Sequence, residues 1–478
     1  MPVSIWERGD GYYFVRFSRP ESFRRSAYVI GDFNAHSRGS VELKWCGQEI
    51  CANIALPPGR YSYHYEIDGK QLLDPDPQGS ENALVIPQSR AKRRKRDFTS
   101  IYQIFVDRFL CVTQEERQVR DQEGDQGRER KGADLRAMAD KLDHVKALGF
   151  GAVYLTPIFL SPSYHRYDVM DFFNVDDYLG GNAAFSLFLS KAHSLGLEVI
   201  LDMPVHHTSS RSPYFLEALR GSKFREWYYM DEVGYDTFAN AKSMPKLNYN
   251  GAGEWMKDVF RHWSTFGVDG FRIDVASGIP PCRLWELKNY VAKPIIAEVW
   301  EKPYMWFNAV DGVMNYQLWD AIMKFFQGQT SARDLREVIL EQRRLFPRPF
   351  ALHSWNFLGT HDTPRAFTLL KDKMRAALVL IYFLPGTPLL YYGDEIPMEG
   401  NADPDNRRCM DWSAAPALSD LVTKLNALRR PRAIRSVKLR GECLEMETDV
   451  ARASFCPSGK HDVFYRRGKR KAKSDVFL

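Results

Sequence analysis

The sequence of 478 residues predicts an α/β protein: a (β/α)8 barrel with an inserted subdomain after its third strand, an N-terminal β-sandwich and a short C-terminal β region. Two observations predict the barrel. Between residues 100 and 412, short apolar runs alternate with segments of helical spacing, which is typical of a parallel sheet covered on both faces. Polar residues directly follow several of these runs, as they do at the carboxyl ends of barrel strands.

The composition limits the class of protein. A net charge of +6, with 44% hydrophobic and 26% charged residues, argues against a disordered, collagen-like or coiled-coil chain. No apolar run approaches the roughly 20 residues of a membrane span, and the N-terminus lacks a signal-peptide pattern. The seven cysteines include no CxxC pair, so we expect reduced thiols, no zinc site, no disulfide framework and a cytoplasmic protein.

The N-terminal region, residues 1–95, is predicted to form the β-sandwich. Runs rich in aromatic and β-branched residues at 11–17, 27–30 and 60–67 alternate with turn residues such as Asp68-Gly69. Residues 74–77 and the basic run at 92–96 then indicate a linker. We expect no nucleic-acid partner, because no aromatic pattern or binding-fold signature accompanies the basic runs.

The barrel is predicted over residues 96–415, and its eight candidate strands are 101–106, 151–155, 197–201, 270–273, 294–297, 312–314, 355–358 and 388–392. Helical spacing covers 134–148 and 183–195. The segment 208–250 is too long for an ordinary strand-to-helix loop, so it predicts the inserted subdomain. Residues 416–478 should hold the last barrel helix and a short β region with strands at 437–439 and 463–465. The basic residues 466–473 are expected to form a frayed tail.

Polar side chains follow five of the eight candidate strands. They are His165 and Tyr167 after the second strand, Asp202 and His207 after the third, Arg272 and Asp274 on the fourth, Glu298 and Trp300 on the fifth, and His361 and Asp362 on the seventh. Charges are costly to bury, so this many at one barrel mouth need a reason. Glycoside hydrolysis requires such a set, with one carboxylate as nucleophile and one carboxylic acid as proton donor.

Spacing assigns the two roles. Arg272 lies two residues before Asp274, so both side chains share one face of the strand. We expect the guanidinium to lower the pKa of Asp274 and keep it ionised as the nucleophile. Glu298, beside Trp300 and shielded from water, is expected to keep its proton near neutral pH and act as the acid.

These stretches resemble the conserved regions of glycoside hydrolase family 13, the α-amylase family. Gly270-Phe271-Arg272-Ile273-Asp274 is similar to its G-F-R-x-D pattern, Glu298-Val299-Trp300 to E-x-W, and His361-Asp362 to H-D. The resemblance implies that Asp274 is the nucleophile, Glu298 the general acid/base and Asp362 a third carboxylate that binds sugar hydroxyls. It implies substrate contacts for His165, Tyr167, Asp202, His207, Arg272, His361, Trp300 and Arg408.

Three further stretches narrow the resemblance to the neopullulanase, cyclomaltodextrinase and maltogenic amylase group. They are residues 244–248, which read M-P-K-L-N, and residues 102–109 and 403–408. The resemblance implies a retaining hydrolase that cleaves α-1,4 bonds in cyclodextrins, pullulan, starch or maltooligosaccharides. It allows α-1,6 cleavage, transglycosylation, and a homodimer through a carbohydrate-binding-like N-terminal sandwich.

The sequence departs from the family at two points. His206 stands where the family usually has Asn, and residues 110–130 lack the Asn/Asp/Gly pattern that often binds calcium in relatives. We therefore expect no required cofactor, and the sequence does not support a calcium site.

Other interpretations stay open. An α-1,6 debranching enzyme or an α-glucanotransferase would use the same barrel chemistry, because loops beyond the reacting sugar choose the bond and the acceptor. A catalytically inactive glycan-binding scaffold is a further alternative. At single residues, the histidines could be core residues, Asp202 could orient Arg272 rather than contact sugar, and Trp300 could serve packing.

Overall fold

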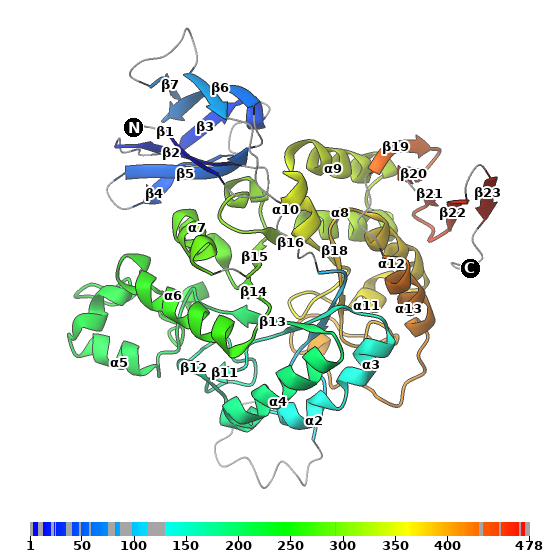
Figure 1. The fold of residues 1–478 in the computed structure, drawn as a ribbon, viewed down its shortest axis with the longest axis horizontal. Coiled ribbons are helices and arrows are strands. Elements are labelled where there is room, and N and C mark those ends of the chain that lie inside the picture. Colours follow the sequence, from blue (N-terminus) through cyan, green and yellow to red (C-terminus); the bar gives the residue numbers. More distant parts are fainter. Residues whose placement is uncertain are drawn as a thin grey trace.

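The computed structural model describes residues 3–7, 13–20, 23, 25–34, 41–46, 49–56, 59–74, 82–86, 98–112, 130–291, 293–429, 434–448, 451–467 and 470–473. Within them, eight parallel strands close into a barrel (Figure 1), which confirms the predicted fold class. The strands are β9 (Ile101–Ile104), β10 (Ala152–Leu155), β13 (Glu198–Met203), β14 (Gly270–Ile273), β15 (Ile295–Val299), β16 (Gly312–Asn315), β17 (Trp355–Asn356) and β18 (Thr387–Tyr391).

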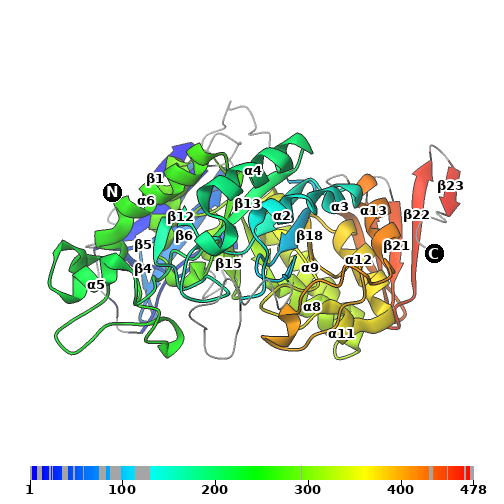
Figure 2. The ribbon, with the colours of Figure 1, turned by 90° about the horizontal axis from the view of Figure 1, so that it is seen from below.

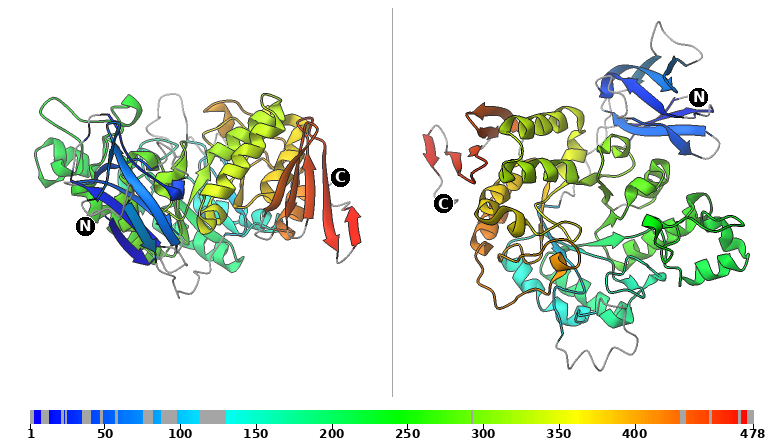
Figure 3. Two further views of the ribbon diagram at one scale, coloured as in Figure 1. Left: turned by 90° about the horizontal axis from the view of Figure 1, so that it is seen from above. Right: turned by 180° about the vertical axis from the view of Figure 1, so that it is seen from behind.

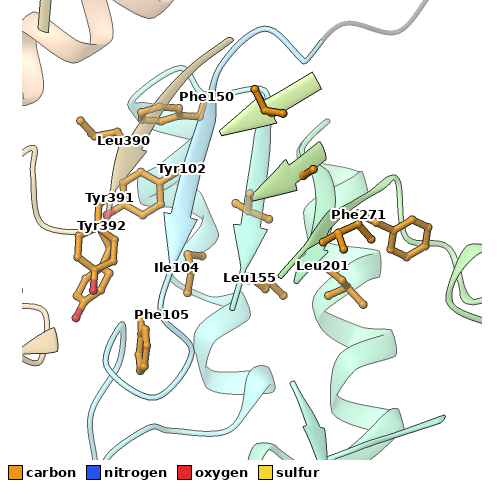
Figure 4. Packing of buried hydrophobic residues seen from close by; sticks show 14 of the residues in the cluster. Tyr102, Ile104, Phe105, Phe150, Leu155, Leu201, Phe271, Leu390, Tyr391 and Tyr392 are labelled. Atoms are coloured by element: carbon orange, nitrogen blue, oxygen red, sulfur yellow. The ribbon is translucent and has the colours of Figure 1, made fainter. Parts of the chain in front are cut away.

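Alternate residues of the barrel strands point inward and outward, because side chains alternate along a strand. Ile101, Tyr154, Ile200, Ile296 and Trp355 belong to one buried cluster that fills the barrel. Their neighbours belong to a second, larger cluster between the strands and the helices; Figure 4 shows Tyr102, Leu155, Leu201 and Phe271 of this set. The strands are apolar on both faces for this reason.

Helices cover the outside of the barrel. They are α2 (Leu135–Ala139), α3 (Leu142–Ala147), α4 (Gly181–Ser194), α6 (Tyr249–Phe266), α7 (Pro281–Tyr290), α8 (Tyr316–Gln327), α9 (Ala332–Leu345), α10 (Arg348–His353), α11 (Ala366–Leu370), α12 (Met374–Phe383) and α13 (Ser419–Ala427). The longest, α6, buries Trp255, Val259 and Trp263 on one face and ends at Gly267, whose left-handed φ of +117° stops the helix. The described helices include none with the length and apolar character that crossing a bilayer requires.

The loops after β10 and β13 are enlarged. The first carries a hairpin of β11 (Phe159–Leu160) and β12 (Asp171–Val175), and the second carries α5 (Pro213–Leu219) and two 3-10 turns, η3 (Lys223–Trp227) and η4 (Phe238–Asn240). Trp227 packs between Tyr214 and Trp255, with ring centroids 5.0 and 5.3 Å away. Two backbone bonds, Thr208 N to Pro245 O (3.1 Å) and Leu247 N to His206 O (3.1 Å), attach this segment beside the end of β13.

The N-terminal region is a sandwich of two antiparallel sheets. One contains β1 (Val3–Glu7), β2 (Tyr13–Arg19), β4 (Lys44–Cys46) and β5 (Glu49–Leu56), and the other contains β3 (Ala27–Gly31), β6 (Gly59–Ile67), β7 (Lys70–Leu72) and β8 (Asn82–Ile86). Val15 and Phe17 from one sheet and Val29 and Tyr65 from the other share one buried core. Part of the predicted linker, residues 75–77 and 92–96, lies outside the described residues.

The C-terminal region is a five-stranded antiparallel meander of β19 (Ile434–Arg440), β20 (Cys443–Thr448), β21 (Ala451–Phe455), β22 (His461–Arg467) and β23 (Arg470–Lys473) (Figure 2). The predicted frayed tail is wrong, because β23 pairs with β22 from Arg467↔Arg470 to Phe464↔Lys473. Lysine and arginine on an edge strand are common, since charge discourages pairing with other chains. Figure 3 shows the sandwich and this sheet at separate places on the outside of the barrel.

The prediction of reduced thiols and no disulfide framework is also wrong. Cys111 is bonded to Cys409, Cys443 is bonded to Cys456, and Cys282 is disulfide-bonded as well. Cys51 is a buried free thiol. The first pair is separated by 298 residues, so only the closed barrel brings its two sulfur atoms together. Spacing rules for cysteines detect local pairs and metal sites, and this pair is neither.

Candidate active site

Acidic side chains gather at the carboxyl ends of three neighbouring strands. Asp202 on β13 lies opposite Arg272 on β14 in the strand pairing, and Glu298 is the fourth residue of β15. All three are buried, and Asp202 and Glu298 lie two residues beyond Ile200 and Ile296, which fill the barrel interior. Asp274 directly follows β14, and Asp362 arrives on the loop after β17. Strand alternation therefore places these groups at one mouth of the barrel.

Arg272 is the centre of this cluster. Its side chain is fully buried, and its Nη1 donates to Asp202 Oδ1 and to Asp274 Oδ1, each at 2.7 Å. Its Nη2 lies 3.2 Å from Glu298 Oε2 and 3.8 Å from Asp362 Oδ2. One guanidinium thus brings together four carboxylates from four strands or their loops. This arrangement holds the two residues assigned as nucleophile and acid on adjacent nitrogens of one planar group.

The pKa of Asp274 shifts in the direction opposite to the expectation. Burial raises the pKa of Asp274 well above its usual value, and the nearby carboxylates of Glu298, Asp202 and Asp362 add to the increase. Arg272 acts in the expected direction and lowers the pKa, but burial outweighs it in the site without substrate. Sequence spacing identified the pairing with Arg272, but it could not show the burial of Asp274 or the three other carboxyl groups beside it.

Both oxygens of Glu298 accept hydrogen bonds. The backbone N–H of Val275 donates to Oε2 at 2.9 Å, and Trp300 Nε1 donates to Oε1 at 3.0 Å. Val275, directly after Asp274, has a left-handed φ of +46°. The Trp300 ring stacks on Tyr316 with centroids 3.7 Å apart and is 47% exposed. Trp300 therefore both orients Glu298 and presents an aromatic surface to solvent.

A chain of hydrogen bonds links the other carboxylates. Gln103 Nε2 lies 2.8 Å from His361 Nδ1, His361 Nε2 lies 2.5 Å from the Tyr167 hydroxyl, and that hydroxyl donates to Asp202 Oδ2 at 2.8 Å. Burial lowers the pKa of His361 well below its usual value, so the ring is neutral. The Gln103 amide nitrogen can only donate, so with this amide orientation the His361 proton sits on Nε2 and points to Tyr167.

Asp362 lies beside this chain. Its Oδ2 is 3.3 Å from His361 Nε2, and burial raises its pKa while Arg272 and Arg407 oppose the increase. The second strand contributes Tyr154, whose hydroxyl donates to Asp202 Oδ2 at 2.5 Å. Asp202 thus accepts from Arg272 and two tyrosines, which uses its oxygens within the protein. The sequence analysis missed Gln103 and Tyr154, although both are inward-facing residues on predicted strands.

The remaining predicted histidines border the site. His165 Nδ1 accepts from the Tyr167 backbone N–H at 3.1 Å, which holds the turn that carries both rings. His207 is buried, and its ring stacks on Phe238 at 5.1 Å. Its Nδ1 lies 3.2 Å from His206 Nδ1, and burial lowers the pKa of His207 to about 3 and that of His206 to about 4. Both rings are therefore neutral at pH 7.

The structure does not bring Arg408 to the cluster. Its side chain is exposed and forms an ion pair with Asp405. The preceding residue, Arg407, is buried instead: its Nε donates to the His361 carbonyl at 2.9 Å and its Nη2 lies 3.4 Å from Asp362 Oδ1. The 3-10 turn η8 (Asp405–Arg407) aims the first of two adjacent arginines inward. The sequence contains both arginines, and no local pattern predicts which of them points into the site.

His206 stands where the resembled family usually has Asn, and its imidazole ring offers no oxygen ligand to a calcium ion. Calcium prefers six to eight oxygen ligands. Cys111, at the start of the 110–130 segment, is in a disulfide, and residues 113–129 lie outside the described residues. His206 presents a ring that packs against Gly278.

Comparisons with known proteins agree with the geometry. The cyclomaltodextrinase of Geobacillus thermopakistaniensis (strain MAS1) is 34% identical over 333 residues, which is 64% of this chain and 57% of that protein. Neopullulanase 2 of Thermoactinomyces vulgaris is 34% identical over 306 residues, 59% of this chain and 52% of that protein. The chain spans a little over half the length of these relatives.

Solved structures show the same architecture. The cyclic alpha-maltosyl-(1→6)-maltose hydrolase from Arthrobacter globiformis, in complex with maltose, superposes with a TM-score of 0.68 at 27% identity, covering 77% of this chain and 91% of that chain. The type III pullulan hydrolase from Thermococcus kodakarensis covers 98% of this chain and 96% of that chain with a TM-score of 0.71; at 21% identity it shows the fold alone. A family model described as "Alpha amylase, catalytic domain" matches residues 103–300 and 285–438. The chain belongs to the alpha-amylase family.

Proposed function

We propose that this protein is a retaining glycoside hydrolase that cleaves α-1,4-glucosidic bonds in cyclodextrins, pullulan, starch or maltooligosaccharides. The observation that carries the proposal is the buried guanidinium of Arg272, which contacts Asp274 through one nitrogen and lies 3.2 Å from Glu298 through the other. These contacts place the two carboxyl groups beside one guanidinium, and retaining glycosidases use a close pair of carboxyl groups, about 5–5.5 Å apart.

In the proposed reaction Asp274 attacks the anomeric carbon and forms a covalent β-glycosyl intermediate. Glu298 protonates the departing glycosidic oxygen and then takes a proton from the incoming water, so the α-configuration is restored. A sugar hydroxyl in place of that water would give transglycosylation. Arg272 stays within the wall of the site, where its positive charge favours the ionised form of Asp274 and opposes the effect of burial.

The surrounding groups hold the reacting sugar in this proposal. Asp362, with a carboxylate next to Arg407 and His361, accepts from the sugar hydroxyls. Tyr167 and the exposed face of Trp300 offer flat surfaces to sugar rings. His165 and His207 line the same mouth, and Asp202 acts mainly by orienting Arg272 and Tyr167.

The first prediction tests the acid. Glu298→Gln removes the exchangeable proton but keeps the shape of the side chain and an acceptor for Val275 or Trp300. We expect kcat on the best α-glucan substrate to fall by about 10²–10⁴-fold, the usual contribution of general acid–base catalysis. Initial rates with purified protein measure this.

The matched control is Glu337→Gln, an exposed glutamate of α9, which should keep wild-type rates. Hydrolysis by Glu298→Gln at the wild-type rate would contradict the role of Glu298. Product stereochemistry is an independent check: proton NMR of fresh product should show the α-anomer, and an initial β-anomer would contradict the two-step route.

A substrate panel of β-cyclodextrin, pullulan and soluble starch separates the alternatives. Preference for cyclodextrin, with panose released from pullulan, supports the cyclomaltodextrinase and neopullulanase assignment. Maltotriose from pullulan would indicate an α-1,6 debranching enzyme, and longer products without net hydrolysis would indicate a glucanotransferase. Binding without turnover of any glucan would indicate the inactive scaffold.

We also infer a homodimer through the N-terminal sandwich. Light scattering on the purified chain tests whether it is a dimer, and the same measurement on a chain without residues 1–95 tests whether the sandwich forms the contact. A cytoplasmic location stays a prediction, and the disulfides remove one of its supports. Disulfides persist mainly in oxidising compartments, with intracellular proteins of hyperthermophiles as the known exception.

A further inference from the structure

The loop after β18, residues 393–418, is the element on which this inference rests. It runs 26 residues from Gly393 to Leu418 with only η8 as regular structure, and it contains Arg407 beside Asp362. Loops of this length within a compact domain usually serve a function. What holds the loop in place therefore decides where Arg407 sits.

One side of the loop is attached to the segment after β17. Arg365 Nε donates to the Asn406 carbonyl at 3.0 Å, and Asn406 Nδ2 donates to the carbonyls of His361 (2.8 Å) and Thr363 (2.9 Å). These bonds place η8 next to the residues that carry Asp362. They use main-chain carbonyls, so they hold the loop without contacting the carboxylates.

The other side is attached to the segment after β9. Met410 N donates to the Arg108 carbonyl at 2.9 Å, and Trp412 Nε1 donates to the Phe109 carbonyl at 3.0 Å. The disulfide from Cys409 to Cys111 joins the same two segments. The first and eighth strands of the barrel are neighbours, so this covalent bond closes the mouth on the side away from Asp274.

We propose that the Cys111–Cys409 disulfide is a positioning element for substrate binding: it holds Arg407 against Asp362 and the His361 carbonyl, and its reduction weakens the binding of the glucan. Only one residue separates Cys409 from Arg407. When the disulfide is broken and the backbone at Cys409 moves more freely, the Arg407 guanidinium therefore also becomes less fixed. The inference rests on the proposed function. The catalytic pair, Asp274 and Glu298, is held by Arg272 and Val275 and not by this loop.

The chemistry requires a dithiol reductant. One of its thiolates attacks a sulfur of the disulfide, the protein S–S bond breaks through a mixed disulfide, and the reagent closes to its own cyclic disulfide. The reagent supplies two electrons and two protons, and Cys111 and Cys409 become thiols. Both cysteines are partly exposed to solvent, so a small dithiol can reach them.

The experiment compares the oxidised and dithiothreitol-reduced full-length protein. Alkylation followed by peptide mass mapping shows which cysteines are reduced, and kinetics on β-cyclodextrin and maltohexaose give KM and kcat. Reduction should raise KM by about 3- to 10-fold, which corresponds to one weakened hydrogen bond to a charged group, with kcat within about twofold. Reoxidation should restore KM.

The second pair supplies a matched control, because Cys443–Cys456 joins β20 and β21 of the C-terminal sheet. Cys443→Ser/Cys456→Ser should respond to reductant as the wild type does. Cys111→Ser/Cys409→Ser should have the raised KM from the start and no response. Mapped reduction of Cys111 and Cys409 with an unchanged KM would overturn the inference, even if the double variant fails to fold.

A binding measurement separates this inference from the proposed function. Calorimetric titration with maltohexaose needs no turnover, and reduction should raise Kd by the same factor as KM. If the oxidised protein binds the glucan but hydrolyses none, the proposed function fails while the effect of reduction on Kd still decides the inference. If Kd is the same in both redox states, the inference fails while hydrolysis stands.

Discussion

At the scale of single residues, His206 and Gly278 form a size-matched pair close in the chain to Asp202 and Asp274. A Cβ built on Gly278 would lie 2.4 Å from both Cδ2 and Nε2 of the His206 ring. Gly278 ends the 3-10 turn η5 (Ala276–Gly278), which follows Asp274 and Val275, and His206 follows β13. The ring occupies the space that any larger residue at 278 would need, so the pair sets the position of the turn.

Gly278→Ala should destabilise the protein by about 1–3 kcal/mol through overpacking, and the shifted turn should lower kcat. His206→Asn in the same chain should recover part of the loss, because the smaller side chain frees the space. A double-mutant cycle by urea unfolding measures the coupling. Gly234→Ala is the control, since a Cβ there meets nothing within 4 Å. Equal stability of the two alanine variants would show that the His206 ring moves aside at no cost.

At the scale of elements, helix α9 connects the barrel to the C-terminal sheet. Its N-terminus has a capping box in which the Ser331 side chain accepts from the Asp334 N–H and the Asp334 carboxylate accepts from the Ser331 N–H at 2.9 Å. Arg336 Nε from the same helix donates to the Val437 carbonyl of β19 at 3.1 Å. The cap therefore supports the surface on which the C-terminal sheet is attached.

Ser331→Ala should lower the free energy of unfolding by about 1 kcal/mol, the usual cost of losing such a cap, without changing kcat. Thermal and urea unfolding followed by circular dichroism measure it. Ser190→Ala is the control, because Ser190 lies within α4, is exposed, and bonds only to the Ser186 carbonyl of its own helix. A loss as large for Ser190→Ala would mean that the cap itself contributes nothing specific.

At the scale of the whole molecule, buried histidines and carboxyl groups impose opposite pH dependences on stability. The pKa of His206 is lowered to about 4 and that of His207 to about 3, so between pH 6.5 and 4 the unfolded chain takes up protons that the folded chain does not. Stability from these rings is lost as the pH falls through that range. Burial raises the pKa of Asp202, Asp274 and Asp362, and these groups act in the other direction.

The contribution of one ring can be isolated by comparison with His206→Asn. The stability advantage of the wild type over this variant should shrink by about 1–2 kcal/mol from pH 7 to pH 5, because the variant has lost one titration that penalises folding in acid. Urea unfolding at each pH measures the two free energies. An advantage that is constant over this range would mean that His206 is protonated equally in both states.

The barrel and its main acidic residues follow from local patterns in the sequence. Eight apolar runs at barrel spacing predict eight strands, and period-two alternation places Arg272 with Asp274 on one face. Short motifs then identify Asp274, Glu298 and Asp362 as the main acidic residues of the candidate site. Each of these signals lies within a few neighbouring residues, which is why it can be read without coordinates.

Only the tertiary structure decided the rest. It joined Cys111 to Cys409 across 298 residues, turned Arg407 rather than Arg408 inward, and paired Arg470–Lys473 as an edge strand. It also showed that burial, not Arg272, dominates the pKa of Asp274. Disulfide pairing, burial and electrostatic balance depend on groups that are distant in sequence and meet only after the barrel closes. Local sequence patterns therefore cannot predict these properties.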